Sequence, residues 1–157
     1  MRRTSMIAAV AAAALAFLLA PASAEAQSTS FTVTATVGTA CTVTAAPISI
    51  ASYDPNLGVP TVGTTNVNVA CTRGTAYTTF LSSANSWRLL NTVTPANFLT
   101  YGITQGGTGT AWTATSGWAG VAADRLPFAY LATASVGALQ DVPAGSYLDT
   151  VTVNVIY

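Results

Sequence analysis

The sequence predicts one all-β domain, built as a two-sheet sandwich, behind a short apolar N-terminal segment. Three observations favour this fold class. Apolar and polar residues alternate with a period of two along several stretches, no helical periodicity occurs, and clusters of turn-forming residues separate the stretches. Residues 27–157 have the size of a single domain that can bury a real core.

Residues 1–26 are organised as a secretory signal peptide. Two arginines near the start are followed by an unbroken apolar run at residues 6–20, and small residues at alternate positions end at Ala24 and Ala26. The apolar run has 15 residues, fewer than the roughly 20 that a membrane-spanning helix needs. We expect cleavage after Ala26, with Ala24 as the alternative, so that the mature chain begins at Gln27 and is exported.

Three stretches carry the clearest strand pattern, because β-branched and apolar residues alternate with polar ones. They are residues 31–37, 66–71 and 151–157. Weaker strand candidates are residues 47–51, 76–82, 98–104 and 126–132. Turn signals lie at residues 53–58, 106–109 and 143–145. The stretch 106–124 is the least regular and predicts a long loop or an irregular hairpin.

Charge is sparse in this chain. Charged residues make up 6% of the sequence, against about 25% in ordinary domains. After cleavage, three Arg stand against four Asp, which leaves a net charge of −1. Nucleic-acid binding needs several cations that neutralise phosphates. The composition therefore excludes a nucleic-acid partner and an electrostatic attachment to a membrane surface.

The two cysteines are Cys41 and Cys71. In an exported chain such a pair predicts a disulfide. The bond would close a loop of about 31 residues, for which the chain-entropy model gives roughly 3–4 kcal/mol. A metal site or a nucleophilic thiol is the alternative, but no His is present to serve as its partner.

Groups that transfer protons or attack substrates are scarce, so we expect no enzyme and no cofactor. His is absent, and the mature chain has four scattered Asp as its carboxylates. Asp124 and Asp141 could approach each other, but their spacing does not predict a catalytic pair. Asp54 lies in a turn sequence, where Asp commonly bonds its own backbone. Asp149 opens the last strand and is expected to cap a turn or a strand edge.

Aromatic residues offer one binding hypothesis. Trp87, Trp112 and Trp118 could form a platform on which a sugar ring stacks. Packing within the core or the loops is the alternative for such residues in a small β-sandwich.

Both ends of the mature chain carry apolar stripes. Phe31, Val33, Ala35 and Val37 would lie on one face of a strand at its start. The strand at residues 147–157 closes the chain, and nothing follows to cover the neighbouring edge. An open edge invites pairing with another strand, and the N-terminal stripe could fill it in the next molecule by strand addition. The pattern leaves open whether the stripe pairs within its own domain or in another copy.

Together these residues resemble the spore coat protein U domain family, which includes archaic chaperone–usher pilins. The closing segment carries the strongest likeness, with Gly-x-Tyr-x-Asp-Thr ahead of alternating valines and a terminal aromatic. The segments that carry the resemblance are 31–37 with Cys41, Tyr53-Asp54-Pro55, 67–77, 99–101 and 145–157.

The resemblance implies an immunoglobulin-like β-sandwich that lacks its last strand. Residues 27–40 would be a donor segment and residues 41–157 the pilin-like domain. Phe31, Val33, Ala35 and Val37 would enter the groove of a neighbouring subunit, and the disulfide would tie the first strand to the body of the domain. The acceptor groove would be walled by Val151, Val153, Val155 and Tyr157.

The resemblance also implies partners and a location. The partners would be neighbouring subunits, a periplasmic chaperone and an outer-membrane usher, with no small-molecule cofactor. The chain would pass through the periplasm to the cell surface. A self-contained adhesive or carbohydrate-binding module is the alternative, and the sequence leaves open whether the product is a pilus, a coat layer or a soluble secreted protein.

Overall fold

The computed structural model describes residues 25–50, 52–106 and 108–157, so most of the predicted signal peptide lies outside the described residues. Nine strands and no helix occur in these ranges, and nothing described there forms a helix suited to crossing a membrane. The strands are β1 (Cys41–Ala45), β2 (Thr61–Cys71), β3 (Ala76–Ser83), β4 (Arg88–Asn91), β5 (Phe98–Gln105), β6 (Trp118–Val121), β7 (Phe128–Val136), β8 (Tyr147–Leu148) and β9 (Val151–Ile156).

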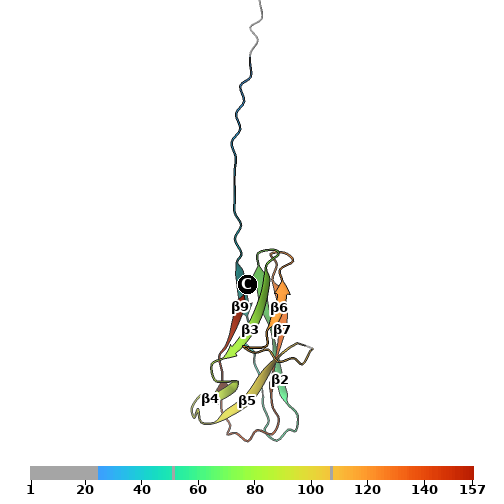
Figure 1. Cartoon of the computed structure of the whole chain (residues 1–157). Helices are drawn as coiled ribbons and strands as arrows, with labels where there is room; N and C mark the ends of the chain where they lie inside the picture. The colour runs from blue at the N-terminus through green and yellow to red at the C-terminus, as the bar shows by residue number, and fades with distance from the viewer. Residues whose placement is uncertain (1–24, 51, 107) are drawn as a thin grey trace, which may run out of the picture. The chain divides into compact units, whose positions relative to one another are not determined.

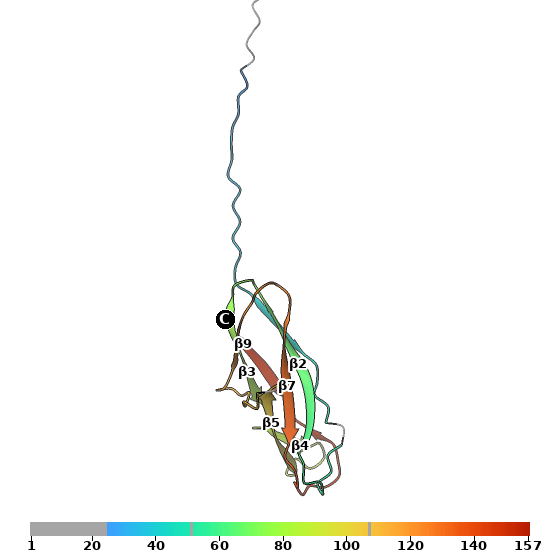
Figure 2. The same cartoon turned by 90° about the vertical axis from the view of Figure 1, so that its right-hand side faces the viewer.

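The strands form two antiparallel sheets that face each other (Figures 1 and 2). The larger sheet has the order β1-β2-β7-β5-β4-β8, and the smaller one has the order β6-β3-β9. The chain crosses between the two sheets several times, the last time between β8 and β9. Such crossings are typical of an immunoglobulin-like sandwich. The predicted all-β sandwich is confirmed.

The core lies between the sheets and follows the predicted alternation. Every second residue is buried along much of β3 and β7 and in the second half of β2, because successive side chains of a strand point to opposite faces. The buried members of the main cluster are Val67, Val69, Cys71, Tyr77, Leu81, Ile103, Trp112, Tyr130, Ala132 and Ala134.

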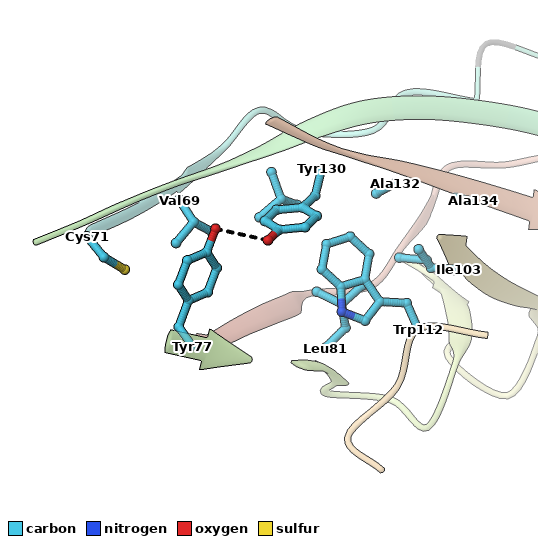
Figure 3. Close-up of a cluster of buried hydrophobic side chains, with 10 residues drawn as sticks. Val69, Cys71, Tyr77, Leu81, Ile103, Trp112, Tyr130, Ala132 and Ala134 are labelled. Atoms are coloured by element: carbon cyan, nitrogen blue, oxygen red, sulfur yellow. Dashed lines mark hydrogen bonds between the residues drawn. The ribbon is translucent and has the colours of Figure 1, made fainter. Parts of the chain in front are cut away.

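Aromatic residues fill the part of the core near β3 and β7 (Figure 3). Trp112 is fully buried, and its indole Nε1 donates a hydrogen bond of 3.0 Å to the carbonyl of Thr79. The hydroxyl of Tyr130 donates to that of Tyr77 at 2.9 Å, as the dashed line in Figure 3 marks. The indole N–H of Trp112 and the hydroxyls of Tyr77 and Tyr130 therefore each have a hydrogen-bond partner, as burial requires.

Several predicted strands are confirmed with changed ends. The stretches 66–71, 76–82 and 98–104 fall within β2, β3 and β5. The stretch 126–132 is displaced, since β7 begins at Phe128. Pro127 cannot donate to a ladder, so the strand starts after it.

Other predictions of strands were wrong. Residues 47–50 form no strand, and the first strand is β1, which ends before Pro47. The predicted strand at 147–157 is two strands, because the chain changes sheets at Asp149 and Thr150. The irregular stretch 106–124 contains β6 among its loops.

The N-terminal part of the chain is a separate unit that ends at Thr36. The strand predicted at 31–37 is absent: residues 25–40 belong to no strand and are exposed. A strand needs a neighbour to bond its backbone, and the described part of the chain supplies none to this segment.

Candidate functional site

An open groove runs between β1 and β9, the outermost strands of the two sheets. Each of these strands is paired on one side only, β1 with β2 and β9 with β3. We call this hollow the edge groove; its volume is about 240 Å³. Its walls include Ala45, Ile48 and Ile50 on the β1 side and Val151 and Val153 on the β9 side. The buried residues of its floor are Val67, Leu81, Ile103, Ala132 and Ala134.

The groove is hollow for two reasons that are visible in the sequence. First, β1 has five residues, and the chain leaves the sheet where Pro47 removes a backbone donor. Second, β7 presents Ala132 and Ala134 to the floor, between the larger Leu81 and Ile103. Alanine methyls leave space that a neighbouring apolar side chain can occupy.

One end of the edge groove is held by the carboxylate of Asp149. It accepts hydrogen bonds from Ser83 Oγ at 2.5 Å, Tyr101 Oη at 2.6 Å and the Thr150 amide at 2.8 Å. Two more come from Asn85, through its Nδ2 at 2.9 Å and its amide at 3.2 Å. The carboxylate therefore ties β3 and β5 to the point where the chain changes sheets, and charge-assisted bonds of this kind are the strong ones.

Tyr101 is kept protonated by its surroundings. Burial raises the pKa of Tyr101 far above its ordinary value, and the hydrogen bond to Asp149 and the negative charge of that carboxylate raise it further. A neutral phenol can donate to Asp149, whereas a phenolate would repel it. Burial likewise raises the pKa of Tyr130, with a contribution from the hydrogen bond to Tyr77.

We expect the free energy of unfolding to fall in alkaline solution. The pKa of Tyr101 is higher in the folded state than the value of about 10 in the unfolded chain. Its contribution is therefore fully present below pH about 10 and is lost as the pH rises toward the folded-state pKa. Urea unfolding at several pH values from 8 to 12 measures this slope. Tyr101→Phe should make the slope shallower, and an unchanged slope in that variant would contradict the assignment.

The N-terminal stripe, Phe31, Val33, Ala35 and Val37, is exposed along its whole length. Phe31 has an exposed fraction of 87%, and Val33 and Val37 each have 82%. Exposed apolar side chains in a regular series are typical of an interaction site.

The predicted wall residues of β9 and the chain end occupy three kinds of position. Val151 and Val153 line the edge groove. Val155 is half-buried against the core cluster, beyond the groove lining. Tyr157 follows the end of β9, has an exposed fraction of 58% and does not line the groove. Their part in binding a donor strand stays a prediction.

Cys41 and Cys71 form the predicted disulfide. The two residues are direct partners in the ladder of β1 and β2, with their Cα atoms 4.1 Å apart. The remaining residues of β1 are exposed, so few side-chain contacts hold this strand. The disulfide therefore fixes one end of a groove wall.

Comparison with known proteins identifies the family. The family model described as the Spore Coat Protein U domain matches residues 27–154. The chain belongs to this family. The match includes the N-terminal stripe as well as the sandwich, so both features are parts of one Spore Coat Protein U domain.

A solved structure has the same fold as this Spore Coat Protein U domain. It is the crystal structure of a CsuC–CsuE chaperone–tip adhesion subunit pre-assembly complex, from the archaic chaperone–usher Csu pili of Acinetobacter baumannii. The TM-score is 0.59 and the identity is 22%, over 78% of this chain and 41% of the matched one. The chain thus spans less than half the length of the matched chain. Among curated proteins, none matches.

The stacking platform considered from the sequence is not assembled in this domain. Trp112 is fully buried. Trp118 packs against Trp112 and Tyr130, with ring centroids 5.6 and 4.7 Å apart. Trp87 packs against Tyr101 at 5.7 Å. The three indoles therefore serve the packing of the Spore Coat Protein U domain, and no common face is left for a sugar ring.

The Asp54 side chain has the turn role that the sequence predicts. Asp54 Oδ1 accepts a hydrogen bond of 2.9 Å from the Asn56 amide, which is the expected turn. Among the residues that the structure describes, no group of three or more acidic, Cys or His side chains is placed to hold a metal ion.

Sequence reasoning missed the floor of the groove and the Tyr101–Asp149 contact. The alternation of Ala132 and Ala134 with polar residues was a usable signal for the floor. The contact joins residues 48 positions apart, and no local pattern predicts such a pair.

Proposed function

We propose that the chain is a structural subunit of a surface pilus or coat, in which each subunit inserts its N-terminal stripe into the edge groove of another. The observation that carries this proposal is the open apolar groove between two strands that are each paired on one side. A strand inserted there would bond both edges and complete the sandwich. The exposed stripe of the same chain has the alternation that such a strand needs.

The energetics are consistent with strand exchange between subunits. Burying three large apolar side chains contributes roughly 1.5–3 kcal/mol each. About half a dozen ladder hydrogen bonds contribute roughly 1 kcal/mol each, net. Ordering seven residues costs around 1–2 kcal/mol each. These terms nearly cancel, so the gain comes from the groove residues that the inserted strand covers.

The family and the solved relative support a chaperone–usher pathway. The relative's subunit is in complex with a chaperone before assembly. By analogy, a periplasmic chaperone would cover the edge groove of this chain, and an outer-membrane usher would exchange it for the stripe of the next subunit. The product would then lie at the cell surface, after cleavage at Ala26 has freed residues 27–40 as the donor segment.

The test is a pair of substitutions on opposite faces of the donor segment. Phe31→Asp with Val33→Asp places charge on the side chains that would enter the groove, and we expect it to abolish polymers. Thr32→Asp with Thr34→Asp adds the same charge to the other face, and we expect it to leave polymers intact. Polymers are measured as denaturant-resistant ladders on electrophoresis. Equal assembly of both variants would overturn the proposal.

A self-contained adhesive module is the competing function. A glycan array with the mature chain tests it directly, because an adhesive module would bind sugars without assembling. The buried position of Trp112 speaks against this alternative.

A further inference from the structure

The few charges of the domain are segregated, and one end of the sandwich is basic. The loops 72–75 and 122–127 lie together there, joined by two backbone hydrogen bonds of 2.8 and 3.0 Å. They carry the exposed side chains of Arg73 and Arg125. With Asp124, which bonds a backbone amide in its own turn, this basic pole has a net charge of +1.

The opposite end of the sandwich is acidic. The loops 52–60 and 137–146 lie together there, joined by a hydrogen bond of 2.7 Å from a backbone amide to the hydroxyl of Tyr53. They carry the exposed carboxylates of Asp54 and Asp141. This acidic pole has a net charge of −2.

The two other charges of the domain are already engaged. Arg88 lies on β4, with its guanidinium 4.9 Å from the centre of the Phe98 ring and its Nε bonded to the Asn85 carbonyl. Asp149 is tied by five hydrogen bonds. Arg88 and Asp149 both bond Asn85, and their opposite charges offset each other, so the uncompensated charges are those of the two poles.

The edge groove leads to the acidic pole. A second hollow, of about 620 Å³, shares lining residues with the groove and continues from it. The shared residues are Ile48, Ile50 and Leu89. Beyond them the second hollow is lined by Tyr53, Pro55 and Val142, which flank Asp54 and Asp141 in the chain.

The N-terminal stripe is connected to the basic pole. Directly after Val37, Thr72 Oγ1 donates a hydrogen bond of 3.2 Å to the carbonyl of Gly38. The same Thr72 Oγ1 accepts a hydrogen bond of 3.1 Å from the Ala40 amide. Thr72 is the neighbour of Arg73. A stripe bound in another subunit therefore brings its own basic pole to the place where it leaves the groove.

The direction of insertion decides which poles meet. β9 runs from Val151, beside Asp149, to Ile156, which pairs with Thr78 near the basic pole. A stripe antiparallel to β9 leaves the groove at the acidic pole. A parallel stripe leaves it at the basic pole and sets two basic poles against each other. β1 runs the other way, from Cys41 beside the basic pole, so a stripe antiparallel to β9 is parallel to β1, and strand pairing alone does not select the direction.

We propose that the acidic pole is a docking face for the basic pole of a second copy of this chain, and that this contact sets the antiparallel direction of the inserted stripe. The inference rests on the proposed function, since the stripe delivers the second copy. Both faces also carry exposed apolar side chains, among them Val93 and Leu139 at the acidic pole and Val121 and Leu126 at the basic pole. Opposite charges steer such an encounter, and the steering weakens as salt is added.

Charge reversal in the full mature chain tests the docking face. Arg73→Asp changes the net charge of the basic pole from +1 to −1. Asp54→Asn with Asp141→Arg changes that of the acidic pole from −2 to +1, and Asn retains the turn-forming side chain. Each change alone makes the two poles alike in sign. The three substitutions together make them opposite again.

We expect each one-pole change to slow polymer growth on the order of tenfold at low salt, measured by light scattering after release from the chaperone. The combined variant should regain most of the rate, and all rates should converge at high salt. Thr64→Asp, an exposed position on β2 away from both poles, is the control for added charge. Equal rates in every variant, or no recovery in the combined variant, would overturn the docking face while leaving strand insertion intact. Failure of the unaltered chain to polymerise would overturn both proposals.

Discussion

Adding a second copy of residues 27–37 after Tyr157, through an Asn-Gly turn, is expected to stabilise the domain by about 2–4 kcal/mol and to stop polymer growth. The two-residue turn favours a hairpin, so the added strand runs antiparallel to β9 and enters the edge groove of its own chain. Its effective concentration would be in the millimolar range or above. The groove residues that are now half-buried, Val151 and Val153, would then become core residues.

Urea unfolding of the extended and unaltered chains measures the gain, and electrophoresis measures the loss of polymers. The matched control carries Asp in place of the added Phe31 and Val33, so that length and turn are unchanged. This control should be no more stable than the unaltered chain and should still assemble. If the extended chain polymerised as well as the unaltered one, the edge groove would not be the acceptor.

Most of the strands and the disulfide were predictable because each depends on local patterns. Period-two alternation in β2 and β9 indicates which face of each strand is turned toward the core. Two cysteines in one exported chain have one possible intramolecular pairing. The same logic failed at residues 47–50. There the apolar residues alternate as in a strand, yet Pro47 prevents β1 from continuing, and the chain becomes a groove wall instead.

The groove itself depends on contacts between distant residues, which a single sequence does not display. Its floor combines Leu81 of β3 with Ala132 and Ala134 of β7. Its end depends on Asp149 reaching Ser83 and Tyr101. Trp112 illustrates the same limit. Its Gly- and Thr-rich surroundings predict a long loop or an irregular hairpin and leave open whether the indole packs or binds a ligand, and the structure shows the indole completely buried.

Replacing both cysteines, as Cys41→Ala with Cys71→Ala, is expected to lower the free energy of unfolding by roughly 3–4 kcal/mol, the loss calculated for a loop of about 31 residues. Alanine avoids a hydroxyl at Cys71, which is buried. Urea unfolding measures the effect. A loss below about 1 kcal/mol would contradict it.

The loss of stability should be larger in β1 than in the rest of the fold, because few other contacts hold this strand. Assembly should weaken as a result, since β1 is a wall of the edge groove. The residues of β1 after Cys41 are exposed, and β1 pairs with β2 alone. Without the bond, β1 can separate from β2 while β3 and β7 stay packed around Trp112. Hydrogen exchange should therefore lose protection at the amides of β1 far more than at those of β3. Uniform loss along both strands would mean that the disulfide stabilises the whole sandwich, and that the groove wall has no separate dependence on it.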